Sequence, residues 1–152
     1  YETGAGSPVK STSYAGSALT HSLTGLTTGA IYRIFVRSKN IEGYSLWSEY
    51  LELAASPLPA TPLAASMLKL SELSAKTTIQ LQWSKVPDQA AKTSGYYLWM
   101  ALNTRGSDDY VLIMNGTDRP ELNEFLVKGL QTGQEYRFKL QALNFNGLSP
   151  MS

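Results

Sequence analysis

Few side chains in this 152-residue chain have the chemistry of a catalyst. His21 is the only histidine and the chain has no cysteine, so it has no thiol nucleophile, disulfide or cysteine-based zinc site. A catalytic centre brings together a nucleophile, a base and a group that orients the base, and His21 supplies one of the three. We therefore expect no enzymatic activity and no cofactor in this segment, and we expect His21 to be partly buried near a sheet end.

The acidic residues do not predict a metal site. Asp108 and Asp109 are adjacent, and Glu121 and Glu124 form a second pair. Calcium takes about six to eight oxygen ligands from a spaced acidic loop, and these pairs supply too few. We interpret them as solvated turn residues.

Asn115 begins the triplet Asn115-Gly116-Thr117, which fits the acceptor pattern for N-glycosylation. Asn-Gly is also a favoured hairpin turn. The triplet therefore predicts a turn, and it predicts a glycan site if the protein is secreted.

Charge and hydropathy exclude two classes of partner. The chain has 13 Lys and Arg against 12 Asp and Glu, a formal net charge of +1, and its basic residues form no stripe. Nucleic-acid binding needs such a stripe, so we expect none. The chain also has no apolar run of membrane-spanning length, so we expect no direct membrane contact from this segment.

The chain contains an internal repeat. The stretch 25–45 recurs as 129–149, with a constant offset of 129 − 25 = 104 residues. The identical pairs are Gly25/Gly129, Leu26/Leu130, Thr28/Thr132, Gly29/Gly133, Tyr32/Tyr136, Arg33/Arg137, Asn40/Asn144, Gly43/Gly147 and Ser45/Ser149. Solenoid repeats have periods of about 20 to 50 residues, whereas this period matches one small domain. The chain is thus predicted to be a piece of a tandem array.

Alternation of apolar and polar residues predicts strands. The runs 79–83, 96–100 and 136–142 alternate with a period of two, and turn signals separate them at the spacing of two packed antiparallel sheets. The stretch 66–74 is the one weak helical candidate. Three prolines between 57 and 62 cannot continue a central strand, so the boundary is placed there: 1–58 is the C-terminal part of one module, and 59–152 is a module without its last strand.

Two segments carry a family resemblance. Residues 26–32 (Leu-Thr-Thr-Gly-Ala-Ile-Tyr) and 130–136 (Leu-Gln-Thr-Gly-Gln-Glu-Tyr) resemble the Leu-x-Pro-Gly-x-x-Tyr corner of fibronectin type III domains, with Thr in place of Pro. In such a corner Gly makes a tight turn and a buried Tyr hydroxyl bonds to backbone upstream. The resemblance assigns structural roles to Leu26, Gly29 and Tyr32 in the first copy, and to Leu130, Gly133 and Tyr136 in the second.

Other elements of the same family follow in order. Residues 81–83 (Leu-Gln-Trp) resemble its second strand, whose tryptophan, here Trp83, is the central core residue, and 144–147 resemble its F to G turn. The resemblance implies an all-β fold of two tandem immunoglobulin-like (fibronectin type III) β-sandwiches, both incomplete at the ends of this chain.

Residues 44–48 (Tyr-Ser-Leu-Trp-Ser) resemble the Trp-Ser-x-Trp-Ser element of cytokine-receptor modules. In that element arginines of strand F stack on the aromatic rings. Arg33 and Arg37 alternate outward on the predicted strand, so we expect a stacking ladder of Arg33, Arg37 and Trp47 that stabilises the module.

The resemblance implies a noncatalytic structural or adhesion array, a stiff spacer that presents surfaces to other proteins. The implied partners are neighbouring modules of the same chain and other proteins or glycans, in an extracellular or cell-surface setting. An intracellular filament or cytoskeletal assembly is the alternative setting. Accessory spacer domains of a large secreted enzyme, such as a glycoside hydrolase, and a cytokine-type receptor ectodomain are the alternative functions.

Overall fold

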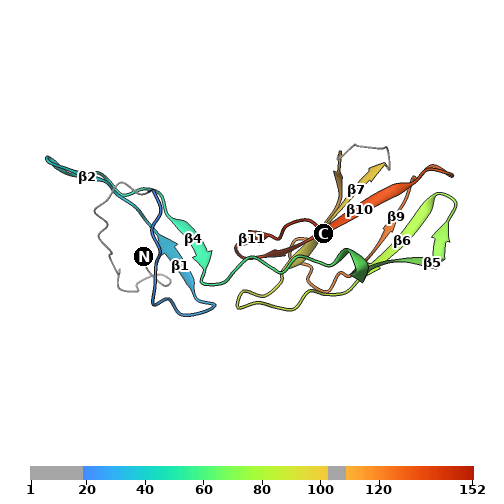
Figure 1. Ribbon diagram of the computed structural model, residues 1–152, viewed down its shortest axis with the longest axis horizontal. Coiled ribbons are helices and arrows are strands. Elements are labelled where there is room, and N and C mark those ends of the chain that lie inside the picture. Colours follow the sequence, from blue (N-terminus) through green and yellow to red (C-terminus); the bar gives the residue numbers. More distant parts are fainter. Residues whose placement is uncertain (1–18, 103–108) are drawn as a thin grey trace. The chain divides into compact units, whose positions relative to one another are not determined.

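The computed structural model describes residues 19–102 and 109–152, and the described part of the chain is all-β (Figure 1). Within these ranges the sole helix is a single 3-10 turn, η1 (Ala64–Ser66). This confirms the predicted fold class. The chain divides into two compact units between Ser56 and Pro57.

The first unit is built on two antiparallel pairs. β1 (Ile31–Ile34) pairs with β4 (Leu51–Ala54), and β2 (Lys39–Asn40) pairs with β3 (Gly43–Tyr44). Tyr32 and Ala54 are its buried apolar residues among those described. β1 ends at Ile34, and beyond it the amides of Val36 and Ser38 donate to the hydroxyls of Ser48 and Ser45.

The second unit has two sheets. One sheet has the order β5-β6-β9, formed by β5 (Met67–Ala75), β6 (Thr78–Trp83) and β9 (Glu124–Val127). The other has the order β11-β10-β7-β8, formed by β7 (Gly95–Leu102), β8 (Val111–Asn115), β10 (Tyr136–Asn144) and β11 (Gly147–Leu148). All pairs are antiparallel, as a sandwich of meandering strands requires.

The inward faces of these two sheets form one core. Trp83 of β6 is 2% exposed and meets Tyr96 of β7 edge to face, with 6.0 Å between ring centroids. Leu98 and Leu140 belong to the same buried cluster, at 0% and 1% exposure. Fully burying side chains of this size contributes about 1.5–3 kcal/mol each, so this cluster is the main source of stability in the unit.

The weak helical candidate at 66–74 is wrong. This stretch is β5, whose backbone pairs with β6 from Met67 opposite Trp83 to Leu70 opposite Gln80. A bulge follows before Ala75 pairs with Thr78. Pairing with a core strand satisfies the backbone polar groups that a short isolated helix would leave open, and so overrides the weak local preference.

Candidate functional site

A tyrosine corner is present in each copy. The Tyr32 hydroxyl accepts a hydrogen bond from the backbone N–H of Thr27 at 2.7 Å, and the Tyr136 hydroxyl accepts one from Gln131 at 2.9 Å. The donor lies five residues upstream in both copies. Tyr32 is buried and Tyr136 is partly buried. Each bond ties the entry of a strand to the turn that precedes it.

The glycines and leucines of the corner hold this geometry. Gly29 has φ 79° and Gly133 has φ 83°, a left-handed conformation that strains any side chain. Leu130 is 6% exposed and packs in the core, whereas Leu26 is partly exposed. Threonine precedes this glycine in both copies, and the glycine keeps its left-handed conformation in both.

Two serines of the first copy satisfy backbone groups after β1 ends. Ser45 Oγ accepts from the N–H of Ser38 at 3.0 Å and donates to the Leu46 carbonyl at 2.9 Å. Ser48 Oγ accepts from the N–H of Val36 at 3.0 Å. The two hydroxyls accept the hydrogen bonds that carbonyl groups accept in a regular strand pair. Segment 45–48 therefore lies beside segment 36–38 without being assigned as a strand.

The second copy repeats this arrangement in a buried setting. Ser149 Oγ accepts from the N–H of Ala142 at 3.0 Å and donates to the Pro150 carbonyl at 2.8 Å. Ser152 Oγ accepts from the N–H of Leu140 at 2.9 Å. Sequence reasoning noted Ser149 as a repeated residue and missed its role. The signal available was the identical spacing of two serines in both copies.

Cations and aromatic rings alternate on one face of the first unit. The guanidinium of Arg37 lies 3.9 Å from the Tyr44 ring centroid and 4.3 Å from that of Trp47, so it contacts two rings. Arg33 lies 5.0 Å from the Tyr50 ring. The expected ladder residues thus take different partners, since Arg37 lies over Trp47 whereas Arg33 lies over Tyr50.

Further contacts extend this ladder at both ends. Phe35 meets Trp47 and Tyr50 edge-on, at centroid distances of 6.4 and 5.8 Å. Arg33 Nε also donates to Glu52 Oε1 at 2.6 Å, across the β1–β4 pair. Cation–π contacts at exposed sites are worth about 0.5–1 kcal/mol each. The ladder can stabilise the edge of the unit, and it offers polarised rings and guanidinium groups to solvent.

The corresponding side chains of the second unit make different contacts. Trp99 Nε1 donates to Gln141 Oε1 at 2.8 Å, and Gln141 Nε2 donates to the Ser149 carbonyl at 2.7 Å. Lys139 lies 4.4 Å from the Tyr110 ring. The aromatic partners here come from the β7–β8 side of β10, whereas in the first unit they come from β3 and the segment that follows it.

His21 does not match its expected environment. It is exposed and lies ahead of β1 in a stretch without assigned strand structure. At the repeat offset of 125 − 21 = 104 residues its counterpart is Phe125, which is partly buried in β9. The residues that would pair with such a strand in the second unit belong to β6, and no counterpart of β6 occurs in residues 19–56.

Asn115 is the exposed last residue of β8. Its Oδ1 accepts hydrogen bonds from Thr117, from the N–H at 3.0 Å and from Oγ1 at 2.7 Å. The side chain is therefore held by the turn at residues 117–118. This turn leads from β8 to β9 of the other sheet, so the Asn-Gly step does not form a hairpin.

Three of the four acidic residues in the two pairs lie in the described part of the chain. Asp108 lies outside the described residues, and Asp109, Glu121 and Glu124 are exposed. No group of three or more His, Cys, Asp or Glu residues able to hold a metal ion occurs in ranges 19–102 and 109–152. No helix in the described part of the chain is long and apolar enough to cross a membrane.

The two-layer sandwich, the tyrosine corner and the strand-edge serines together define an immunoglobulin-like β module. The family model of the fibronectin type III domain matches residues 64–152, and the chain belongs to that family. The family predicted from the corner motifs is thereby confirmed.

Relatives are modules of long proteins. The chain is 27% identical over 150 residues to fibronectin type-III domain-containing protein 3a of Gallus gallus, covering 92% of this chain and 11% of that protein. It is 29% identical over 134 residues to M-protein, striated muscle, of Gallus gallus, covering 84% of this chain and 8% of that protein. The chain thus spans a small fraction of each relative.

Solved structures share the fold. The crystal structure of chicken CNTN1 domains FN1–FN3 matches with a TM-score of 0.56 at 16% identity, over 87% of this chain and 43% of that one. Domains A168 to A170 of titin match with a TM-score of 0.53 at 20% identity, over 81% of this chain and 38% of that one. At these identities the likeness establishes the architecture alone.

Proposed function

We propose that this chain is a noncatalytic structural segment of a multi-domain protein, a spacer that also offers surfaces for protein contact. The observation that carries the proposal is the repeated corner, with Tyr32 and Tyr136 making the same bond 104 residues apart, since 136 − 32 = 104. A catalyst needs converging reactive groups, whereas a spacer needs repeated rigid modules. The matches to segments of long proteins support the second reading.

The partners we propose are neighbouring modules of the same polypeptide and other proteins or glycans. The cation–aromatic ladder around Arg37 is the surface of the first unit best suited to such contact. Exposed rings beside cations are favourable contact groups, since tyrosine, tryptophan and arginine dominate binding energies at interfaces.

Mechanical extension of single molecules tests the spacer function. The second unit comprises residues 57–152, or 152 − 57 + 1 = 96 residues, and a stretched chain reaches about 3.3–3.6 Å per residue. We expect the 152-residue chain, held between marker domains, to show a force peak followed by a lengthening of roughly 30 nm, and to refold on relaxation. Extension of the second unit without a resolvable peak would contradict the spacer function.

The setting is tested by mass measurement of the Asn115 peptide in protein from its natural source. A glycan on Asn115 supports the extracellular or cell-surface setting. Quantitative absence of a glycan supports the intracellular filament setting, in line with the name of the striated-muscle relative.

A further inference from the structure

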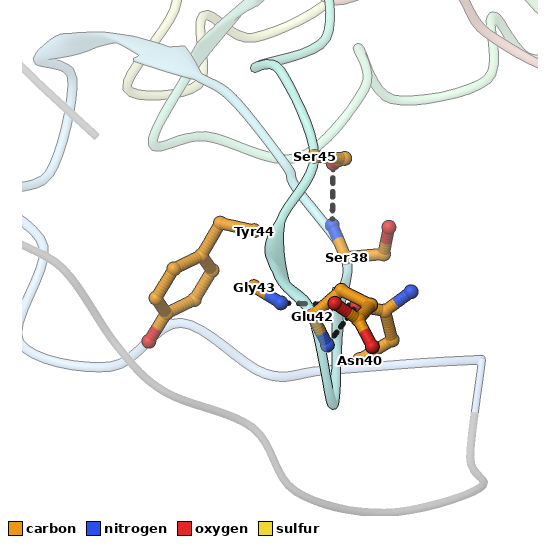
Figure 2. A pocket seen from close by; sticks show the side chains of 6 residues that line it. All are labelled: Ser38, Asn40, Glu42, Gly43, Tyr44 and Ser45. Carbon is orange, nitrogen blue, oxygen red and sulfur yellow. Dashed lines mark hydrogen bonds between the residues drawn. The ribbon is translucent and has the colours of Figure 1, made fainter.

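The pocket beside the β2–β3 hairpin of the first unit belongs to the hairpin itself (Figure 2). Asn40 Oδ1 accepts from the N–H groups of Glu42 and Gly43, at 3.0 and 3.1 Å, which closes the turn. The matching Asn144 of the second unit also accepts from a turn N–H, and its Nδ2 donates to the Pro57 carbonyl at 3.0 Å. Residues of the same module fill that place, so the pocket reflects module packing and indicates no ligand.

Strand β9 has an open edge in the second unit. Within the described residues it pairs with β6 alone, in the order β5-β6-β9. The Trp83 N–H donates to the Asn123 carbonyl at 2.9 Å, and antiparallel pairs alternate between bonded and non-bonded positions. The odd-numbered residues of β9 therefore bond to β6, whereas Glu124 and Leu126 direct their N–H and C=O groups to the open edge. Such an edge is a template for pairing with another strand.

The side chains along this edge change in charge from one end to the other. Phe125 and Val127 pack in the core, so the even-numbered side chains lie on the outer face of the sheet. Glu124 is exposed, Leu126 is 37% exposed, and Lys128, which directly follows β9, is exposed. The edge thus presents an acidic, an apolar and a basic side chain at intervals of two residues.

This charge pattern occurs in the second copy of the repeat and is absent from the first. At the offset of 124 − 20 = 104 residues, the counterparts of the three side chains are Thr20, Ser22 and Thr24, and none of them is charged. The corner motif and the family resemblance are common to both copies, so neither of them requires the acidic and basic residues. The pattern is therefore a property of this module.

We propose that β9 pairs antiparallel with β9 of a second copy of this chain, with Leu126 opposite the partner's Leu126. About the two-fold axis Glu124 then lies opposite the partner's Lys128, and Phe125 lies opposite the partner's Val127. A shift of two residues in either direction places Leu126 opposite a charged side chain, so charge and hydrophobicity select one register. The contact is isologous, and it adds the sheet of one copy to that of the other.

This contact goes beyond the spacer function, because it joins two arrays laterally. One short strand supplies few backbone bonds and few side-chain pairs, so we expect weak association of the free chain, with a Kd of about 1 mM. Modules tethered in an array have a raised effective concentration, so the same contact is stronger between arrays that carry several such modules.

NMR spectra of the full 152-residue chain at increasing concentration test the contact. We expect the amide shifts of Glu124, Leu126 and Lys128 to change with concentration. Glu124→Lys and Lys128→Glu each bring like charges into opposition at both ends of the pair, and each should weaken association at least about tenfold. Glu121→Lys is the matched control, because Glu121 is exposed and lies outside β9; it should leave association unchanged.

An equimolar mixture of the Glu124→Lys and Lys128→Glu variants distinguishes this pairing from other kinds of contact. In a mixed pair each lysine faces a glutamate, so the mixture should associate about as tightly as the unaltered chain, while neither variant does so alone. Both positions are exposed, so the folded state tolerates these substitutions. Absence of concentration-dependent shifts at β9, undiminished association of either single variant, or failure of the mixture to associate would each overturn the proposal.

Discussion

Replacing Ser149 by alanine removes a hydroxyl that bonds within the sandwich of the second unit. Ser149 is 2% exposed, and its Oγ accepts from the N–H of Ala142 and donates to the carbonyl of Pro150. Ala142 is 0% exposed. Water therefore cannot replace the lost acceptor, and the Ala142 amide is left buried without one.

The expected loss follows from that burial. A buried N–H without an acceptor costs about 1–3 kcal/mol, so we expect Ser149→Ala to lower the free energy of unfolding of the second unit by about 2 kcal/mol. For a unit of this size about 1 kcal/mol corresponds to about 4–8 °C in Tm. The midpoint should thus fall by about 8–16 °C.

Ser45→Ala is the matched control, since Ser45 makes the same pair of bonds in the first unit but is exposed, as is its donor Ser38. Water can solvate the Ser38 amide, so the cost there should be below about 0.5 kcal/mol. Urea unfolding of the two variants, followed by amide signals assigned to each unit, measures both losses. Faster hydrogen exchange at Ala142 should accompany the first. Equal and small effects at both serines would refute the argument from burial.

Three further outcomes are expected. Tyr96, whose pKa is raised above its usual 10.0 by burial, holds its proton longer in the folded state; stability should therefore fall as pH rises above about 10, and Tyr96→Phe should flatten that fall in alkaline unfolding curves. Arg37→Ala should lower the stability of the first unit by about 1 kcal/mol, with altered NMR shifts of the Trp47 indole, whereas Arg37→Lys should lose less; no change in either measurement contradicts the stacking. Asn144→Asp keeps the turn acceptor but loses the donor to Pro57, and should destabilise the second unit by about 1–3 kcal/mol in urea unfolding; unaltered stability would count against that contact.

Local sequence patterns predicted much of the fold. The corner glycines, the following tyrosines and the alternating runs lie within a few residues of one another, so their geometry depends on neighbouring φ and ψ angles and on which side chains share a strand face. Trp83 as the core residue also follows from alternation, because its strand has one apolar face.

The sequence predicted that arginines stack on aromatic rings in the first unit, but it did not predict which arginine contacts which ring. Arg33 lies opposite Glu52 in the β1–β4 register and takes Tyr50 as its ring partner, while Arg37 lies between Tyr44 and Trp47. Such pairs depend on how far two segments slide against each other, and a shift of one residue would reverse every side chain.

By itself, then, the amino-acid order determined the family, the repeat and the turn at each corner, because these depend on contacts close along the chain. Tertiary structure alone decided which serine hydroxyls replace backbone carbonyls, and which of two matching asparagines is covered. The amide of Asn144 is buried against Pro57, whereas Asn40 is exposed. Identical residues differ here because burial is a property of what packs against them, and the packing partner lies far away in the sequence.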